Sequence, residues 1–169
     1  MSKSILLSIR PQWVEKILNG KKTIEVRKRF PKDYVGWVYI YCTKDYKKIL
    51  FENGGYGWRL NTWNKNKNAI TTNNGKVVAR FWCDNVEEIS AKNIESFTKD
   101  SCLTVKQIED YLWKNICNGY AIHISKLEIF DEPKELSEFN YWKDKSEYGC
   151  WYENKLTKAP QNYCYIEGE

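Results

Sequence analysis

The stretch "SIRPQWVEKILNGKKTIEVRKRFP", residues 8–31, carries the strongest local signals for the fold. It continues the short apolar segment 4–9, which predicts a buried strand. Pro11 is typical of the first position of a helix, and apolar residues follow it at helical spacing. Asn19-Gly20 is a helix stop. The β-branched segment 23–30 then predicts a second strand, so the order is strand, helix, strand.

The second half of this stretch concentrates positive charge. Residues 20–32 hold six basic residues and one acidic residue, Glu25, and the resulting charge of +5 equals that of the whole chain. The remaining residues therefore sum to zero. Cations gathered in one place are typical of a surface that meets phosphate or carboxylate groups.

The alternation of a strand divides these side chains between two faces. Ile24, Val26 and Phe30 make the expected core face. The opposite face of the same strand carries Thr23, Glu25, Arg27 and Arg29. We expect the Glu25 carboxylate to fix the Arg27 guanidinium or to accept a donor from a ligand. The alternative is a solvated edge strand, whose charges discourage pairing with another chain.

The rest of the chain adds further strands and one more helix. Strands are expected at residues 36–43, 75–89, 119–130 and 159–168. Thr104 is the expected N-cap of a helix at 104–113. Residues 44–74, rich in Asn and Gly, are expected to form a long irregular insertion. We therefore predict one α+β domain over residues 1–169, a small mixed β-barrel of about five or six strands with two or three short helices.

Composition excludes several classes of function. The six cysteines form no CxxC pair and there is a single histidine, His123, so neither a metal site nor a cofactor is predicted. His123 is expected to be structural. No segment has the length of a membrane span or the pattern of a signal peptide, which predicts a cytoplasmic protein with reduced thiols.

The quoted stretch resembles the opening of an ASCH domain, a family of the PUA-like superfamily. Gly20, Lys22, Glu25 and Arg27 match the family's GxKxxExR pattern, and "GKVVARFWCDNV" and "GYAIHISKLEIFDEPKEL" are similar to later strands of small bacterial and phage-borne members. The resemblance covers most of the chain outside 44–74. It implies a PUA-like barrel whose cleft binds RNA or a nucleotide-like ligand.

Our first hypothesis is therefore an RNA- or modified-nucleoside-binding domain with a basic cleft around the motif. Its expected ligand-binding residues are the polar set Arg10, Lys21, Lys22, Thr23, Glu25, Arg27 and Arg29, with Trp13, Tyr41 and Trp58 as stacking aromatics. Whether Lys22 faces the cleft depends on where the strand begins, and the sequence leaves this open. It also leaves the oligomeric state open.

Two other interpretations remain. One is a metal-independent hydrolase with Lys22 and Glu25 as catalytic residues. The resemblance includes one ASCH branch that hydrolyses N4-acetylcytidine with a Lys, a Thr and a Glu. The Lys of that branch matches Lys22, and its Glu falls near Asp100. Its Thr position is occupied here by Glu25, and Thr23 is the nearest hydroxyl. Another branch is reported as a ribonuclease. The last interpretation is a protein-interaction module that uses the aromatic insertion.

Overall fold

A computed structural model of the chain describes residues 2–45, 48–50, 56–58, 73–113, 118–142 and 154–168. Its strands are β1 (Ser2–Ile9), β2 (Ile24–Arg27), β3 (Gly36–Cys42), β4 (Lys48–Leu50), β5 (Tyr56–Trp58), β6 (Val77–Cys83), β7 (Val86–Ile89), β8 (Gly119–His123), β9 (Ser125–Lys134) and β10 (Tyr163–Gly168). Its helices are α1 (Pro11–Leu18), α2 (Thr98–Ser101) and α3 (Val105–Leu112), with short 3-10 turns η1 (Ile94–Phe97) and η3 (Leu136–Glu138). The predicted α+β class is confirmed.

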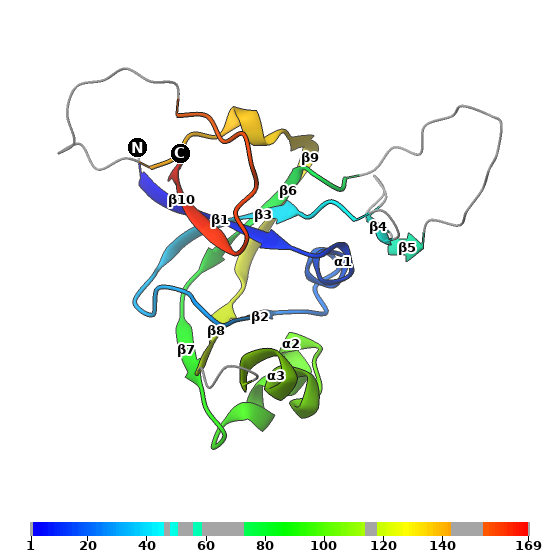
Figure 1. The fold of residues 1–169 in the computed structure, drawn as a ribbon, viewed down its shortest axis with the longest axis vertical. Helices are drawn as coiled ribbons and strands as arrows, with labels where there is room; N and C mark the ends of the chain where they lie inside the picture. Colours follow the sequence, from blue (N-terminus) through cyan, green and yellow to red (C-terminus); the bar gives the residue numbers. More distant parts are fainter. Residues whose placement is uncertain are drawn as a thin grey trace.

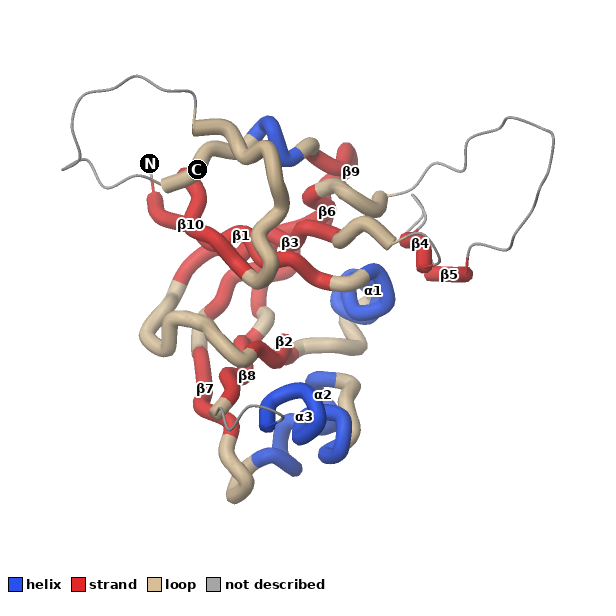
Figure 2. Tube along the Cα trace, viewed as in Figure 1, coloured by secondary structure: helices blue, strands red, loops and turns tan. Residues whose placement is uncertain are grey.

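The strands form two main sheets and one small ladder (Figure 1). The larger sheet has the order β10-β1-β3-β6-β9, in which β1 runs parallel to β3 and antiparallel to β10. The smaller sheet has the order β2-β8-β7, and β4 pairs with β5. In Figure 2, the helices α2 and α3 lie beyond the smaller sheet, at the end of the molecule away from the larger one.

The predicted closed barrel is corrected, because the strands of the described residues pair in separate sheets. The open seam lies between β2 and the β1–β10 pair. There the Arg27 side chain donates to the Ser8 carbonyl at 2.6 Å and to Asn162 Oδ1 at 3.2 Å. Asn162 Nδ2 in turn donates to the Arg29 carbonyl at 2.8 Å. Side chains therefore bridge the seam where a barrel would have a strand ladder.

The number of strands is also larger than predicted, because two predicted long strands bend and because the insertion 44–74, predicted to be irregular, contains the paired strands β4 and β5. Segment 75–89 divides into β6 and β7 at Asp84-Asn85, and segment 119–130 divides into β8 and β9 at Ile124. Each bend moves the chain from one sheet to the other. The backbone of His123 donates to the Asn85 carbonyl at 3.0 Å, which ties the two bends together.

Three apolar clusters follow from this arrangement. The first lies on the inner face of the larger sheet beneath α1 and includes Ile5, Val38, Ile40 and Phe81. The second joins the smaller sheet to the helices below it, through Ile24, Val26, Ile108 and Leu112. The third covers the outer face of the larger sheet, with Tyr39, Phe139 and Leu156. Strand β2 therefore belongs to the second cluster, to which it contributes Ile24 and Val26.

The predicted helices are confirmed at their ends. Helix α1 begins at Pro11 and ends before Asn19 and Gly20, whose φ of 73° lies in the left-handed region. Helix α3 has a capping box, in which Thr104 accepts from the Gln107 backbone. The short elements η1 and α2 were not predicted. Most of the predicted insertion 44–74 lies outside the described residues.

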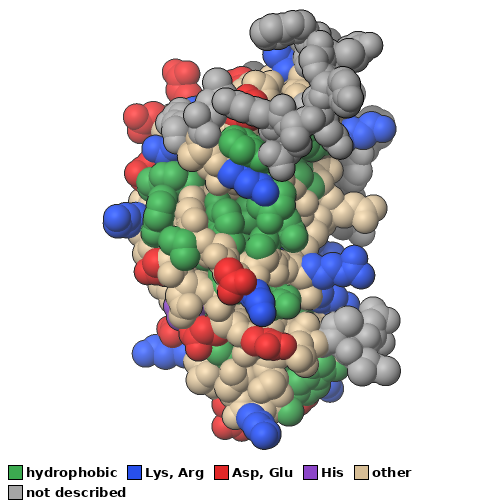
Figure 3. Space-filling view, turned by 90° about the vertical axis from the view of Figure 1, so that its left-hand side faces the viewer, with side chains coloured by type: hydrophobic (Ala, Val, Ile, Leu, Met, Phe, Trp, Pro, Cys, Tyr) green, Lys and Arg blue, Asp and Glu red, His purple; other side chains and the backbone are tan. Residues whose placement is uncertain are grey.

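Charged and apolar side chains are mixed on the surface. The face in Figure 3 carries a group of apolar side chains in its middle, with acidic and basic side chains around it. In the described ranges, no helix has the length and the apolar character that crossing a membrane requires.

Candidate functional site

The motif residues are positioned by the turn that follows α1. Gly20 donates its backbone N–H to the Ile17 carbonyl at 2.9 Å, and Lys22 donates its backbone N–H to the Lys16 carbonyl at 2.9 Å. Glycine adopts the left-handed conformation without steric cost, so the chain reverses directly after the helix. The strand β2 begins only at Ile24. Lys22 therefore precedes the strand, and its direction is set by the turn and not by strand alternation.

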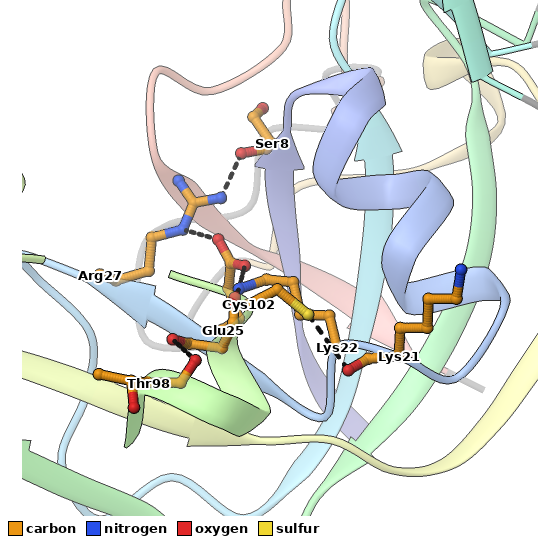
Figure 4. A network of polar contacts seen from close by, with 8 residues as sticks. Ser8, Lys21, Lys22, Glu25, Arg27, Thr98 and Cys102 are labelled. Atoms are coloured by element: carbon orange, nitrogen blue, oxygen red, sulfur yellow. Dashed lines mark hydrogen bonds and ion pairs between the residues drawn. The ribbon is translucent and has the colours of Figure 1, made fainter. Parts of the chain in front are cut away.

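Lys22 is buried inside the molecule, with 2% of its surface exposed. Its ammonium donates to the Ser101 carbonyl at 2.8 Å and lies 3.2 Å from Glu25 Oε2 (Figure 4). Ser101 is the last residue of α2, where backbone carbonyls carry partial negative charge. A buried charge is stable only with partners, and Lys22 has both a carboxylate and a helix end.

Glu25 links Lys22 to Arg27. Its Oε1 lies 3.0 Å from Arg27 Nε, and both side chains are largely buried. This contact is an ion pair by distance, but its alignment is too poor for a hydrogen bond. Arg27 Nε is buried and has no hydrogen-bond partner among the described residues. The two terminal nitrogens of Arg27 are committed to the seam, so Arg27 has a structural task besides facing Glu25.

The end of α2 holds the motif from below. The Thr23 backbone donates to the Asp100 carbonyl at 2.8 Å, and Cys102 Sγ contacts the Lys21 carbonyl at 3.2 Å. Cys102 has a φ of 56°, a left-handed conformation that costs a non-glycine residue about 1–2 kcal/mol. That conformation ends α2 in the position where the Ser101 carbonyl meets Lys22.

These residues lie on the floor of a cleft of about 920 Å³. Its walls come from the ends of β1 and β3, the start of α1, the strand β2, the helix α3 and the segment 157–161. A second hollow of about 730 Å³ lies between the end of α1 and β9 and contains none of the predicted site residues. We place the candidate site in the larger cleft because the buried charges of the motif line it.

Six of the ten predicted residues line this cleft, namely Arg10, Trp13, Lys22, Glu25, Arg27 and Tyr41. Lys21, Thr23 and Arg29 are exposed and do not line it. Figure 4 shows the Lys21 side chain pointing away from the charged network. The side chain of Trp58 lies outside the described residues. The shared face that we predicted for Thr23, Glu25, Arg27 and Arg29 is therefore wrong for its two ends, because β2 is only four residues long.

Sequence reasoning also missed part of the lining. Gln107 and Tyr111 reach the cleft from α3, and Lys158 reaches it from segment 157–161. Tyr111 has 40% of its surface exposed, and the Lys28 ammonium lies 5.3 Å from its ring centroid. Only one feature of the sequence could have predicted this role for Tyr111, namely that it is an aromatic residue on the same face as the apolar stripe of α3. Nothing in the local pattern of 157–161 marks it as a wall.

The charge of the cleft changes from floor to rim. Arg10, Lys44 and Lys158 line the cleft and are exposed. In the part of the chain that the structure describes, none of these three has an ion-pair partner. Tyr41 also lines the cleft but is buried, and burial raises the pKa of its hydroxyl, so this group stays a hydrogen-bond donor at neutral pH.

The groups outside the cleft offer less chemistry. His123 Nε2 contacts Glu87 Oε1 at 2.6 Å on the smaller sheet, and His123 does not line the cleft. Asp100 is exposed and also does not line it. Among the residues with described positions, no group of three His, Cys, Asp or Glu side chains is placed to hold a metal ion.

Comparison with known proteins identifies the fold. No protein-family model matches the chain, and no curated protein matches it by sequence. Among solved structures, the ASCH protein of Zymomonas mobilis matches with a TM-score of 0.60 and 16% sequence identity, over 97% of this chain and 87% of that one. A tyrosine-to-phenylalanine mutant of that protein matches with a TM-score of 0.61 and 16% identity, over 98% and 91%. The resemblance stated from the sequence is thus confirmed for the fold: the chain has the fold of an ASCH protein.

Proposed function

We propose that this chain, with its ASCH fold, binds single-stranded RNA by taking one base into the cleft. The observation that carries the proposal is the gradient of charge in the cleft. On the floor, the Glu25 carboxylate pairs with both cations, Lys22 and Arg27, whereas the rim holds cations that have no acidic partner in the described ranges. Such a rim suits phosphate groups, whereas the floor suits a neutral polar ligand.

The size and lining of the cleft support one base and not a duplex. Its volume, about 920 Å³, falls within the range of small-ligand pockets. Trp13, Tyr41 and Tyr111 line it, and aromatic side chains are the usual stacking partners of unpaired bases. Helix α1 also begins at the cleft with no acidic residue in its first turn, so its positive end favours a nearby phosphate.

The test is a salt titration of binding, measured by fluorescence anisotropy with a labelled single-stranded RNA. We expect the logarithm of the affinity to fall linearly with the logarithm of the salt concentration. Lys158→Ala and Lys44→Ala should each weaken binding and reduce this slope by about 0.7. Lys92→Ala is the matched control, because Lys92 is exposed and does not line the cleft. A slope unchanged in both rim variants would contradict the proposal.

A metal-independent hydrolase is the second candidate, and the buried pair of Lys22 and Glu25, 3.2 Å apart, favours it. The exposed Thr23 hydroxyl does not line the cleft, so it is not in place as a nucleophile. Incubation with N4-acetylcytidine and with RNA, followed by product analysis, separates this candidate from binding alone. Product that is lost in Lys22→Ala and in Glu25→Ala would establish it.

The cytoplasmic location and the protein-interaction surface that the sequence suggested are also part of this proposal. Cys42, Cys83, Cys102 and Cys164, the cysteines within the described ranges, are free thiols, which supports the cytoplasmic location that we infer. The insertion that would serve as a protein-interaction surface lies mostly outside the described residues. A pull-down with and without ribonuclease would show whether a protein partner binds independently of RNA.

A further inference from the structure

The floor of the cleft has hydrogen-bonding capacity that its own contacts leave unused. A carboxylate offers about four lone-pair sites and a lysine ammonium offers three donors. Among the described residues, Glu25 has two partners, Lys22 and Arg27, and the Lys22 ammonium has Glu25 and Ser101 as its ion-pair and hydrogen-bond partners. By this count a ligand in the cleft meets one spare donor on Lys22 and spare acceptor capacity on both oxygens of Glu25.

The spacing of these groups places the donor next to the acceptors. Lys22 Nζ lies 3.2 Å from Glu25 Oε2, and the second oxygen of the same carboxylate, Oε1, faces Arg27. Both Lys22 and Glu25 line the cleft. A ligand that uses the whole group must therefore present one acceptor followed by two adjacent donors.

We propose that the base bound in this cleft is guanine. This inference rests on the function proposed above, because it names the base that the same cleft takes. The Watson–Crick edge of guanine presents O6 as an acceptor and then the N1–H and 2-amino groups as donors. Adenine and cytosine each present one amino donor, and uracil presents one imino donor. Guanine is thus the common base that gives both Glu25 oxygens a hydrogen while Lys22 donates to O6.

The surroundings of the network agree with a stacked, uncharged ligand. The Lys22 ammonium lies 5.4 Å from the centroid of the Trp13 ring, so a base edge that meets Lys22 is within reach of that ring. A phosphate or carboxylate on the floor would instead meet the negative charge of Glu25. The anionic part of the ligand therefore belongs at the rim, beside Arg10, Lys44 and Lys158.

The first experiment changes the ligand and leaves the protein intact. Four labelled oligouridine strands of equal length carry G, A, C or U at one central position, and their affinities are compared at one salt concentration. We expect the G strand to bind about 5- to 150-fold more tightly than the others, the discrimination typical of one bidentate base contact. Inosine, which lacks the 2-amino group, should lose most of this preference. 7-Deazaguanosine, which keeps the Watson–Crick edge, should retain it.

The second experiment changes the acceptor. Glu25→Gln replaces one carboxylate oxygen with a donor, so the preference for G over inosine should vanish while binding to the U strand persists. Glu95→Gln removes one acidic side chain that is exposed and does not line the cleft, and it should leave the preference unchanged. Thermal unfolding of each variant checks that it is folded, and the inosine comparison on the wild-type chain needs no variant.

The outcomes separate this inference from the function on which it rests. Equal affinity for all four strands, with a normal salt slope, overturns the guanine inference and leaves RNA binding in place. A preference for the C strand, or turnover of N4-acetylcytidine, also overturns it. Absence of binding to every strand overturns both the inference and the proposed function.

Discussion

Removing the carboxylate of Glu25 should destabilise the whole domain. Glu25→Gln leaves the Lys22 ammonium, which is 2% exposed, with the Ser101 carbonyl and a neutral amide as its partners. Removing one partner of a buried ion pair costs about 3–5 kcal/mol, and because the Ser101 carbonyl remains as a partner, we expect this variant to lose about 3 kcal/mol. Lys22→Met should cost about the same, because Arg27 Nε is poorly aligned with the carboxylate that remains.

The decisive measurement is a double-mutant cycle. In the double variant neither Lys22 nor Glu25 is left as an unpaired charge, and only the Arg27 guanidinium has lost its carboxylate, so the cost should stay at about 3 kcal/mol instead of the sum of about 6. Urea unfolding followed by tryptophan fluorescence measures each step, and a loss of 3 kcal/mol lowers the midpoint by roughly 1–3 M. The pair of Arg80 and Glu128 supplies the control, because the Glu128 side chain is 47% exposed and Glu128→Gln should therefore cost less than about 1 kcal/mol.

Additive losses would refute this reasoning. If the two single variants cost less than about 1 kcal/mol each, or if their costs summed within about 0.5 kcal/mol, the two charges would act independently. The floor of the cleft would then be hydrated, and the spare hydrogen-bonding groups that we assign to a ligand would already be bound to water.

Three further predictions concern the elements around the cleft. Gly20→Ala should cost about 1–2 kcal/mol in urea unfolding, because a φ of 73° is strained for any residue with a Cβ atom. Thr104→Ala should cost about 1 kcal/mol and reduce the helical signal in circular dichroism, because it removes the capping box of α3. Burial raises the pKa of the Cys42 and Cys83 thiols to about 12, so little thiolate forms at pH 8 and iodoacetamide should label both only after unfolding. Peptide mass mapping should find Cys102 labelled before these two buried thiols.

The sequence predicted the structure best where a short local pattern is compatible with a single local conformation. Pro11 and Gly20 bound α1 as predicted, and Thr104 begins α3, because caps depend on the residues beside them. The charged network could also be predicted in part: the pairing of Glu25 with Arg27 was expected from their spacing, and the geometry bears it out. The role of either residue in binding stays a prediction.

The features that the sequence did not predict depend on contacts between distant segments. Strand alternation could not show that Lys22 turns inward, because its partner Ser101 lies on a helix 79 residues away. The bend at Ile124 was hidden in a continuous β-prone run. The short length of β2 follows from the seam, where Arg27 bonds to Ser8 and Asn162 and no ladder with β1 forms among the described residues.

The pairing of β1 with β10 also constrains the order in which the fold can form during synthesis. Ser2 pairs with Gly168 and Leu7 with Tyr163, so β1 waits for β10, which is made much later. Until β10 leaves the ribosome, β1 has an open edge carrying Ile5, Leu6 and Leu7, and such edges pair readily with other chains. We therefore expect a nascent chain that is truncated before residue 163 to depend on chaperones, whereas the finished chain closes this edge itself.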